Sequence, residues 1–290
     1  MSPRSYGELL RAYRGASPGG GAADHYTIWL RSPEQAVWLR HGASDFDTFR
    51  QVLLRQQYGH AAGGAVATIM DAGANVGLTS VFLLRRYPGA RAIAVEPDPE
   101  NLEVAQRNLE TFGDRAQVIH GAIWNEAGTL NVHRGSFRDG RHWASQVSDA
   151  SDDSVGLVPA FTIEELVADQ GWATLDLLKM DIEGAELQVF RDGPTEFLAG
   201  TRCCMVEVHD HPCYEALVGA LRPHGFRLSQ HSEVTLAKRS GPLQPADPAR
   251  PGAGEPAIDA KPSSARDHGP AFVRGVPGGR RTVDAGGERR

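Results

Sequence analysis

The feature that most limits the fold is an apolar run, VATIM (66–70), which passes through a glycine-containing turn into a helix-like run, GLTSVFLLRRY (77–87). A second apolar run, RAIAVEP (91–97), follows, and another helix-like segment comes after it. The same kind of strand returns at LDLLKM (175–180) and TRCCMVEVHD (201–210). Strands that are apolar throughout are typical of parallel sheets buried on both faces. The sequence therefore predicts a doubly wound α/β domain.

Three segments are expected along the 290 residues. Residues 61–239 carry the strand and helix alternation and form the predicted domain. Residues 1–60 precede it, and their pattern predicts an extension of two strands and a helix that packs on the core. In residues 240–290, Pro, Gly and Ala make up about half of the composition, so too little apolar surface is available to offset the cost of ordering the chain. We expect this tail to be disordered.

Composition excludes several classes of protein. A net charge of −6 argues against a broad nucleic-acid surface, which needs clustered basic residues. No apolar run approaches the roughly 20 residues of a membrane span, and the N-terminus lacks the apolar region of a signal peptide. The cysteines, Cys203, Cys204 and Cys213, form no disulfide framework, which suits a reducing compartment. The predicted location is cytoplasmic.

The turn at DAGANVG (71–77) predicts a nucleotide-like ligand, because ligands of such sheets bind beyond the carboxyl ends of the strands. Gly73 and Gly77 permit close approach of the backbone, but Asn75 stands where a dinucleotide-binding turn has glycine. Glu96, at the end of the next strand, is placed to accept hydrogen bonds from ribose hydroxyls. A ribose without a pyrophosphate indicates S-adenosylmethionine, whose ammonium group Asp71 would face.

Each of these features has a structural alternative. A turn with two glycines between a strand and a helix often does no more than pack tightly, and a lone acid after a strand is equally weak. The combination is more specific, because the turn and Glu96 follow consecutive strands at the separation that ribose binding requires.

Four blocks, DAGANVGLTS, AVEPDPENLEVAQRNL, GAIWNEAGT and LLKMDIEGAELQVF, resemble in order the motifs of the FkbM family of S-adenosylmethionine-dependent methyltransferases. The resemblance covers about residues 35–238, and KMDIEGAE is its most specific part. It implies the class I methyltransferase fold, a Rossmann-like, mostly parallel seven-stranded sheet with an antiparallel last strand, and methyl transfer typically to oxygen. By this resemblance the cofactor-binding residues are Asp71, Gly73, Asn75, Gly77, Glu96 with the adjoining Pro97, and Ala122.

Candidate catalytic residues follow the fourth and fifth strands of the domain. Transfer to a hydroxyl needs little beyond positioning and a base that accepts the proton. Lys179, Asp181 and Glu183 cluster at the end of one strand. Glu207 and His209 lie at the end of the next, where strand alternation puts them on one face. Asp181 and Glu183 also match the family motif. Structural alternatives are an ion pair for Lys179 and a helix cap for Glu183.

The same residues suggest a second chemistry. In metal-dependent O-methyltransferases, acids after these strands hold a divalent ion, and Asp181, Glu207 and His209 occupy comparable places. Carboxylates suit Mg²⁺, whereas histidine favours Mn²⁺ or zinc. We prefer His209 as a general base, with a pKa near 6.5 that neighbouring acids shift, because histidine is a poor Mg²⁺ ligand. A structural zinc is disfavoured, because the HDHPC run (209–213) lacks the usual ligand spacing.

The sequence thus predicts an S-adenosylmethionine-dependent O-methyltransferase that acts on a hydroxyl of a small molecule or sugar. One alternative is an NAD-type oxidoreductase on a similar fold, which Asn75 disfavours. Another is an inert module that keeps only the cofactor turn, which the acids after both strands disfavour. The acceptor and the oligomeric state are not specified by the sequence.

Overall fold

The computed structural model describes residues 10–11, 25–61, 63–134, 145–148, 156–241 and 243. All of them belong to one compact unit, residues 1–250. The tail expected to be disordered, 240–290, lies outside the described residues apart from its first few positions.

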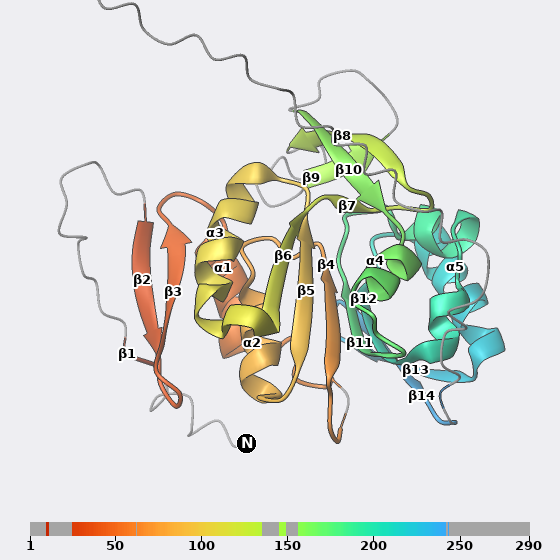
Figure 1. The fold of residues 1–290 in the computed structure, drawn as a ribbon, viewed down its shortest axis with the longest axis horizontal. Helices are drawn as coiled ribbons and strands as arrows, with labels where there is room; N and C mark the ends of the chain where they lie inside the picture. Colours follow the sequence, from red (N-terminus) through yellow and green to blue (C-terminus); the bar gives the residue numbers. More distant parts are fainter. Residues whose placement is uncertain are drawn as a thin grey trace, which may run out of the picture. The chain divides into compact units, whose positions relative to one another are not determined.

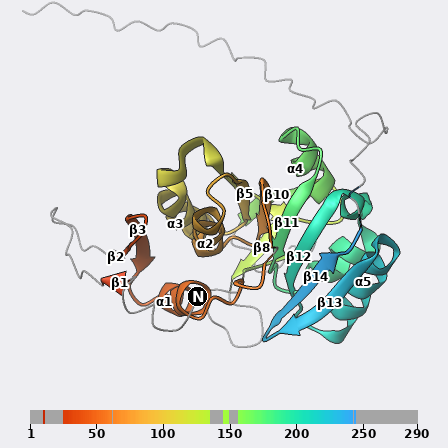
Figure 2. The same cartoon turned by 90° about the horizontal axis from the view of Figure 1, so that it is seen from below.

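The core is a seven-stranded sheet in the order β13-β14-β12-β11-β4-β5-β6 (Figure 1). Its strands are β4 Thr68–Ala72, β5 Arg91–Glu96, β6 Ala116–His120, β11 Leu175–Met180, β12 Thr201–Glu207, β13 Phe226–His231 and β14 Val234–Arg239. The first five pair in parallel, while β14 is antiparallel to both β12 and β13. Figure 2 shows β11, β12, β14 and β13 following one another across the sheet. The predicted fold, with its antiparallel last strand, is confirmed.

Both faces of the sheet are buried, which explains the continuous apolar strands. In β12, Cys203 packs into the apolar cluster that contains α2 (Leu78–Arg86) and α3 (Pro99–Leu109). Its neighbour Cys204 packs into the opposite cluster with α4 (Ile163–Asp169) and α5 (His211–Leu221). None of the helices in the described part of the chain has the length and apolar character that a membrane crossing requires.

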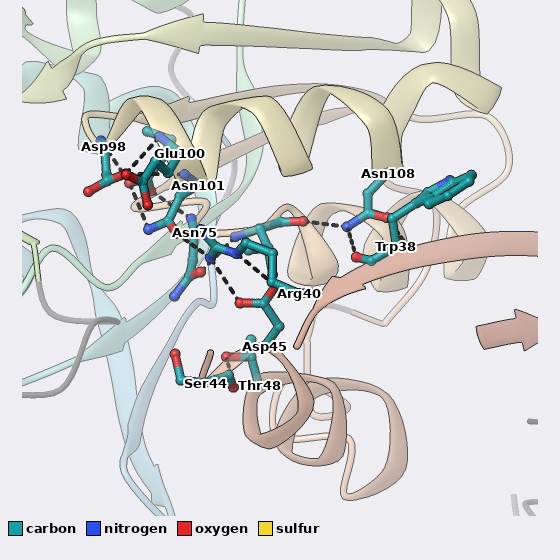
Figure 3. A network of polar contacts seen from close by, with 12 residues as sticks. Trp38, Arg40, Ser44, Asp45, Thr48, Asn75, Asp98, Glu100, Asn101 and Asn108 are labelled. Carbon is teal, nitrogen blue, oxygen red and sulfur yellow. Dashed lines mark hydrogen bonds and ion pairs between the residues drawn. The ribbon is translucent and has the colours of Figure 1, made fainter. Parts of the chain in front are cut away.

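The N-terminal residues form their own small sheet, β1 (Leu10–Arg11), β2 (His25–Leu30) and β3 (Gln35–Arg40), and then a helix. The helix is α1 (Asp45–Phe49) with a π-helical continuation, η2 (Arg50–Leu54). The Asn108 side chain of α3 accepts from the Trp38 N–H at 2.6 Å and donates to the Trp38 carbonyl at 3.1 Å (Figure 3). Arg40 binds Asp45 at 2.8 Å and the Asn101 side chain of α3 at 2.7 Å. These contacts tie the extension to the helix beside the cofactor turn.

A second small sheet was not expected from the sequence. It has the order β7-β10-β8-β9, with β7 Ala122–Ile123, β8 Gly128–Arg134, β9 Ser145–Ser148 and β10 Gly156–Phe161. One of its strands, β9, lies within the polar stretch 134–154, for which the sequence alone predicts a loop, and that prediction is wrong for 145–148. The sequence also predicts one continuous strand over AQVIHGAIW (116–124). The observed strand ends at His120, and at Gly121 a Cβ would lie 2.5 Å from the Phe161 ring. Beyond this break the chain leaves the main sheet and pairs with β10 instead.

Candidate functional site

A cavity lies where the order of the strands reverses, at the carboxyl ends of β4 and β11. In the sheet, β4 lies between β5 and β11: the strands β5 and β6 continue on one side of it, and β11 and β12 on the other. Proteins with α/β sheets bind ligands at such a reversal of strand order. Its enclosed volume is about 50 Å³, so a larger ligand must extend along the open edge. The lining residues come from the carboxyl ends of four parallel strands and from the segments that follow them: Gly73, Asn75, Val95, Glu96, Pro97, Gly121, Ala122, Ile123, Asp181, Ile182 and Glu183.

The two glycines of the turn are required first by the protein's own packing. Gly73 has φ +73°, and a Cβ there would lie 1.8 Å from the Asp181 carbonyl oxygen at the end of the adjacent strand. Gly77 has φ +78°, and a Cβ there would lie 3.1 Å from Cα of Ala105 in α3. Gly73 and Asn75 line the cavity, whereas Gly77 does not. The sequence predicts that the backbone of this turn comes close to a ligand. In the structure, the backbone at Gly73 also comes close to the end of the neighbouring strand β11.

Glu96 presents a buried carboxylate to the cavity, with only 3% of the residue exposed. It accepts from the Asn75 N–H at 2.7 Å and the Asp98 N–H at 3.0 Å, and Asn101 adds a contact of 3.4 Å. Burial raises its pKa to about 7, although the Asp98 and Asn75 hydrogen bonds lower it. Pro97 and Ala122 line the same cavity. The Glu96 carboxylate can accept hydrogen bonds from the two hydroxyls of a ribose, and the apolar surface lies beside it. This combination fits an adenosine ligand.

Asp71 and Lys179 form a buried ion pair beneath the cavity. The Lys179 Nζ lies 3.1 Å from Asp71 Oδ1 and donates to the Gly73 carbonyl at 2.6 Å. The Ser80 hydroxyl donates to the other Asp71 oxygen at 2.7 Å. Burial lowers the pKa of Lys179, but the Asp71 and Asp181 charges outweigh this and raise it. Neither residue lines the cavity, so the geometry matches the structural alternative for Lys179, and the expected contact of Asp71 with a ligand ammonium stays a prediction.

Beside the cavity the structure brings together an acid–histidine cluster, namely Asp181, Glu183, Glu186, Glu207 and His209. The His209 Nε2 lies 3.3 Å from Glu183 Oε2 and 3.6 Å from Asp181 Oδ1. On the other side of the ring, Nδ1 lies 3.1 Å from Glu186 Oε1. The end of β12 places Glu207 in the same group, since ligand atoms of Asp181, Glu207 and His209 all lie within 4.8 Å of one another. The acids after both strands thus meet, as the sequence predicted.

Glu186 is a site residue that sequence reasoning missed. It is fully buried, and its carboxylate accepts from the Ile182 N–H at 3.0 Å and the Gly184 N–H at 2.9 Å. It therefore fixes the turn after β11, in which Glu183 adopts a positive φ of 55°. A buried acid that satisfies backbone amides and also contacts an imidazole is a positioning group. The only sequence sign was its place in the KMDIEGAE block.

The electrostatics of the cluster correct the expectation for His209. Burial lowers the pKa of its imidazole, but hydrogen bonds to Glu183 and Glu186 and the charges of Glu186 and Asp181 raise it to about 11. His209 is then an imidazolium at neutral pH and has no lone pair with which to accept a proton. The expectation of a base that titrates near 6.5 therefore conflicts with the surroundings of this ring, while its participation in catalysis stays a prediction.

The pKa of Glu207 is also raised, but for a carboxyl group this favours the uncharged form. Burial and the Asp181 charge raise the pKa of its carboxyl group to about 8, against the lowering effect of His209. The Gln57 side chain donates to its Oε2 at 3.1 Å. Burial raises the pKa of the neighbouring Tyr58 phenol well above its usual range, and the charges of Asp181 and Glu207 add to that rise. Gln57 and Tyr58 belong to the N-terminal extension, about 150 positions away in the chain, and no sequence pattern linked them to the site.

Comparisons with known proteins agree with this geometry. The family profile of the methyltransferase FkbM domain matches residues 71–235, more than half of the chain. Methyltransferase sdnD of Sordaria araneosa is 29% identical over 195 residues, which cover 56% of this chain and 74% of that protein. The 31-O-demethyl-FK506 methyltransferase FkbM of Streptomyces tacrolimicus is 25% identical over 58% of this chain and 76% of its own length. The 2-O-methyltransferase NoeI of Sinorhizobium fredii is 27% identical over 51% and 65%, respectively.

Among solved structures, the precorrin-6y C5,15-methyltransferase of Geobacter metallireducens aligns over 66% of this chain and 89% of its own, with 12% identity and a TM-score of 0.41. So distant a likeness carries no argument about function. The residues that the family profile matches include the turn after β4, Glu96 and the DIEGAE block, which contribute to the cavity and the cluster. The chain belongs to the FkbM family of S-adenosylmethionine-dependent methyltransferases.

Proposed function

We propose that this protein transfers a methyl group to a hydroxyl oxygen of a small molecule or sugar. The observation that carries the proposal is the acid–histidine cluster at the rim of the cofactor cavity, where Asp181 and Glu183 belong to both. Proton-accepting groups beside the cofactor are what a hydroxyl acceptor requires. The names of two relatives, a 31-O-demethyl-FK506 methyltransferase and a 2-O-methyltransferase, point to the same reaction class.

Binding of the cofactor falls to the residues that line the cavity. The cofactor supplies an electrophilic methyl group on a sulfonium. In our proposal Glu96 accepts hydrogen bonds from the ribose, and Val95, Ala122 and Ile123 provide apolar surface. Asp181 belongs both to the cluster and to the cavity wall, where its charge favours a positive group. Holding the acceptor in line beside the cofactor accounts for much of the rate.

The proton acceptor in this proposal is Glu207. Its pKa of about 8 is close to the operating pH, which is the condition for an effective general base. The His209 imidazolium holds Asp181 and Glu183 in place through contacts of 3.6 and 3.3 Å. In this arrangement His209 is a positioning residue and Glu207 is the group that receives the proton.

A divalent ion is the alternative use of the same atoms. Asp181, Glu207 and His209 each offer one ligand atom within 4.8 Å of the others, a spacing that fits one ion. An ion would need His209 neutral, so it would compete with the proton that Glu183 and Glu186 stabilise. Turnover in excess EDTA separates the mechanisms: we expect it to persist, and loss of activity that Mg²⁺ or Mn²⁺ restores would assign the cluster to a metal.

The function is tested by incubating the purified protein with S-adenosylmethionine and a panel of hydroxylated compounds. Mass spectrometry should detect a product heavier by one methyl group, and Glu207→Gln serves as the control. Calorimetry with S-adenosylhomocysteine and with NAD tests the oxidoreductase alternative, since we expect only the first to bind. A product methylated on nitrogen or carbon would refute transfer to oxygen.

A further inference from the structure

A second cavity opens at the same edge of the sheet, with a volume of about 480 Å³. That size lies within the range of small-molecule sites. It is formed by the segment after α1 and by the turn between β13 and β14. Its lining residues are Gln51, Arg55, Gln56, Gln57, His60, Gln230, His231, Ser232 and Glu233. Because β14 is antiparallel to β12 with Val234 opposite Glu207, this turn lies beside the catalytic end of β12.

One hydrogen bond connects the second cavity to the acid–histidine cluster. Gln57 lines the cavity, and its side-chain amide donates to Glu207 Oε2 at 3.1 Å. On the other side of the cluster, Asp181 and Glu183 line the cofactor cavity. The cluster therefore contacts the linings of both cavities, through Asp181 and Glu183 on one side and through Gln57 on the other.

The chemistry of the lining is polar and nearly balanced in charge. Four glutamines provide both donors and acceptors, and Arg55 and Glu233 carry opposite charges. Alcohol groups, which both donate and accept, match such a surface, whereas an apolar molecule would leave the amides without partners. The His60 and His231 rings stack with their centroids 4.1 Å apart and add a flat wall.

The backbone of this cavity is also unusual. Gln56 has φ +52° and Ser232 has φ +57°, conformations that non-glycine residues rarely adopt. In the described part of the chain five non-glycine residues have positive φ, and four of them line a cavity, Asn75 and Glu183 in the first and these two in the second. Such residues concentrate at functional sites.

We propose that the second cavity is the acceptor site and that it takes a neutral, polyhydroxylated, sugar-like molecule. The inference rests on the proposed function, which it deepens by naming the class of acceptor. A sugar in the cavity contacts the glutamine amides and presents one hydroxyl to Glu207, next to the methyl group held at the first cavity. Gln51 and His231 hold the remainder of the molecule and are specificity residues of the site.

The test uses methyl glycosides of common hexoses as probes, with cyclohexanol as an apolar alcohol for comparison. Binding to the full chain saturated with S-adenosylhomocysteine is measured by saturation-transfer NMR at millimolar probe. We expect at least one glycoside to bind and cyclohexanol not to bind. Gln51→Ala and His231→Ala should each weaken that glycoside about tenfold, as expected for the loss of a well-formed hydrogen bond.

Gln170→Ala is the matched control, because this half-buried glutamine bonds to Gln117 and lines neither cavity. It should leave glycoside binding unchanged. Absence of any glycoside signal from the wild type, equal binding of cyclohexanol, or full binding by both cavity variants would overturn the inference. A glycoside that binds in a Gln51-dependent way but never gains a methyl group would keep the sugar site and refute the proposed function instead.

Discussion

The two cavities at the carboxyl edge of the sheet are built differently. The first is lined by turns that each follow directly on a strand, so that Asn75, Glu96 and Asp181 take their places from the strands before them. The second is assembled from residues 51–60 and 230–233, which no shared strand or helix connects. A site made of strand ends can be located from the sequence, whereas one made of packed segments appears only in the fold.

The ionisable groups differ in the same way. Glu96 is held by amides of Asn75 and Asp98, and its pKa of about 7 arises from burial that local hydrogen bonds oppose. Burial and the charge of Asp181 raise the pKa of Glu207 to about 8, whereas Glu183, Glu186 and Asp181 raise the pKa of His209 to about 11 against the lowering effect of burial. A substitution near Glu96 should therefore alter mainly the pKa of Glu96 itself. A substitution in the acid–histidine cluster should alter the pKa values of several of its members together.

The largest expected effect is on Glu207. Glu207→Gln removes the proton acceptor and keeps the shape, so kcat should fall by about 10²- to 10⁴-fold while S-adenosylhomocysteine affinity is unchanged. In the wild type, kcat should rise with pH through about 8, because the carboxyl group is protonated and inactive below its raised pKa. Steady-state kinetics across pH measures both. A profile without an inflection near this value would return the base role to another residue.

His209 is expected to matter for stability as well as rate. Its raised pKa means that its stabilising effect is complete below about 6.5 and is lost only as the pH rises through about 11. His209→Ala should therefore lower the free energy of unfolding at neutral pH by about 3 kcal/mol, because Glu186 stays buried without its cationic partner. Urea denaturation measures this. Adding Glu186→Gln should restore part of the loss, and no restoration would contradict the ion-pair explanation.

Glu96→Gln tests the first cavity. Weakened acceptance from the ribose should reduce S-adenosylhomocysteine affinity by about ten- to a hundredfold in calorimetry, with the fold intact. Wild-type affinity should also rise with pH through about 7, since only the carboxylate accepts both hydroxyls and its pKa is raised to that value. The glutamine variant should lose this pH dependence. Equal affinities would refute the assignment to the ribose.

A smaller effect is expected from Arg40, which contacts Glu96 indirectly. Arg40 binds Asp45 and Asn101, and Asn101 contacts Glu96 at 3.4 Å. Arg40→Ala should weaken S-adenosylhomocysteine binding by only about three- to tenfold through the loss of one positioning contact. Arg85→Ala is the control, because Arg85 also holds the extension, through the Pro33 carbonyl, but does not contact this chain of residues. Equal losses would indicate general loosening of the extension.

The smallest effect is expected from removal of the tail. Truncation after Leu243 keeps β14, whose Arg239 bonds to the carbonyls of Leu198 and Ala199. Because the composition beyond this point offers little apolar surface, the melting temperature and cofactor affinity should stay nearly unaltered. Differential scanning fluorimetry and calorimetry measure them. A fall of many degrees would show that the tail contributes to folding.

Sequence patterns predicted the main sheet because burial on both faces leaves a direct trace in the composition of a strand. The predicted strand LDLLKM is observed without change as β11. The sequence left the start of the next helix after RAIAVEP open between Asp98 and Pro99, and the structure shows Asp98 as the cap of α3. The second sheet was missed, since β8 (GTLNVHR) alternates apolar with polar residues and β10 (GLVPAF) contains a glycine and a proline, a composition that is also common in loops. Glu186 was visible in the sequence, but its contact with His209 was not.

The sequence by itself determined the fold class, the family and the residues at the strand ends, because each strand dictates where its own last side chains emerge. Only the tertiary structure decided the protonation of His209 and Glu207, the pairing of Asp71 with Lys179, and the existence of a second cavity. The physical reason is that pKa values and cavities depend on which groups burial brings together. Gln57 and Glu207, 150 positions apart, meet only after the chain has packed.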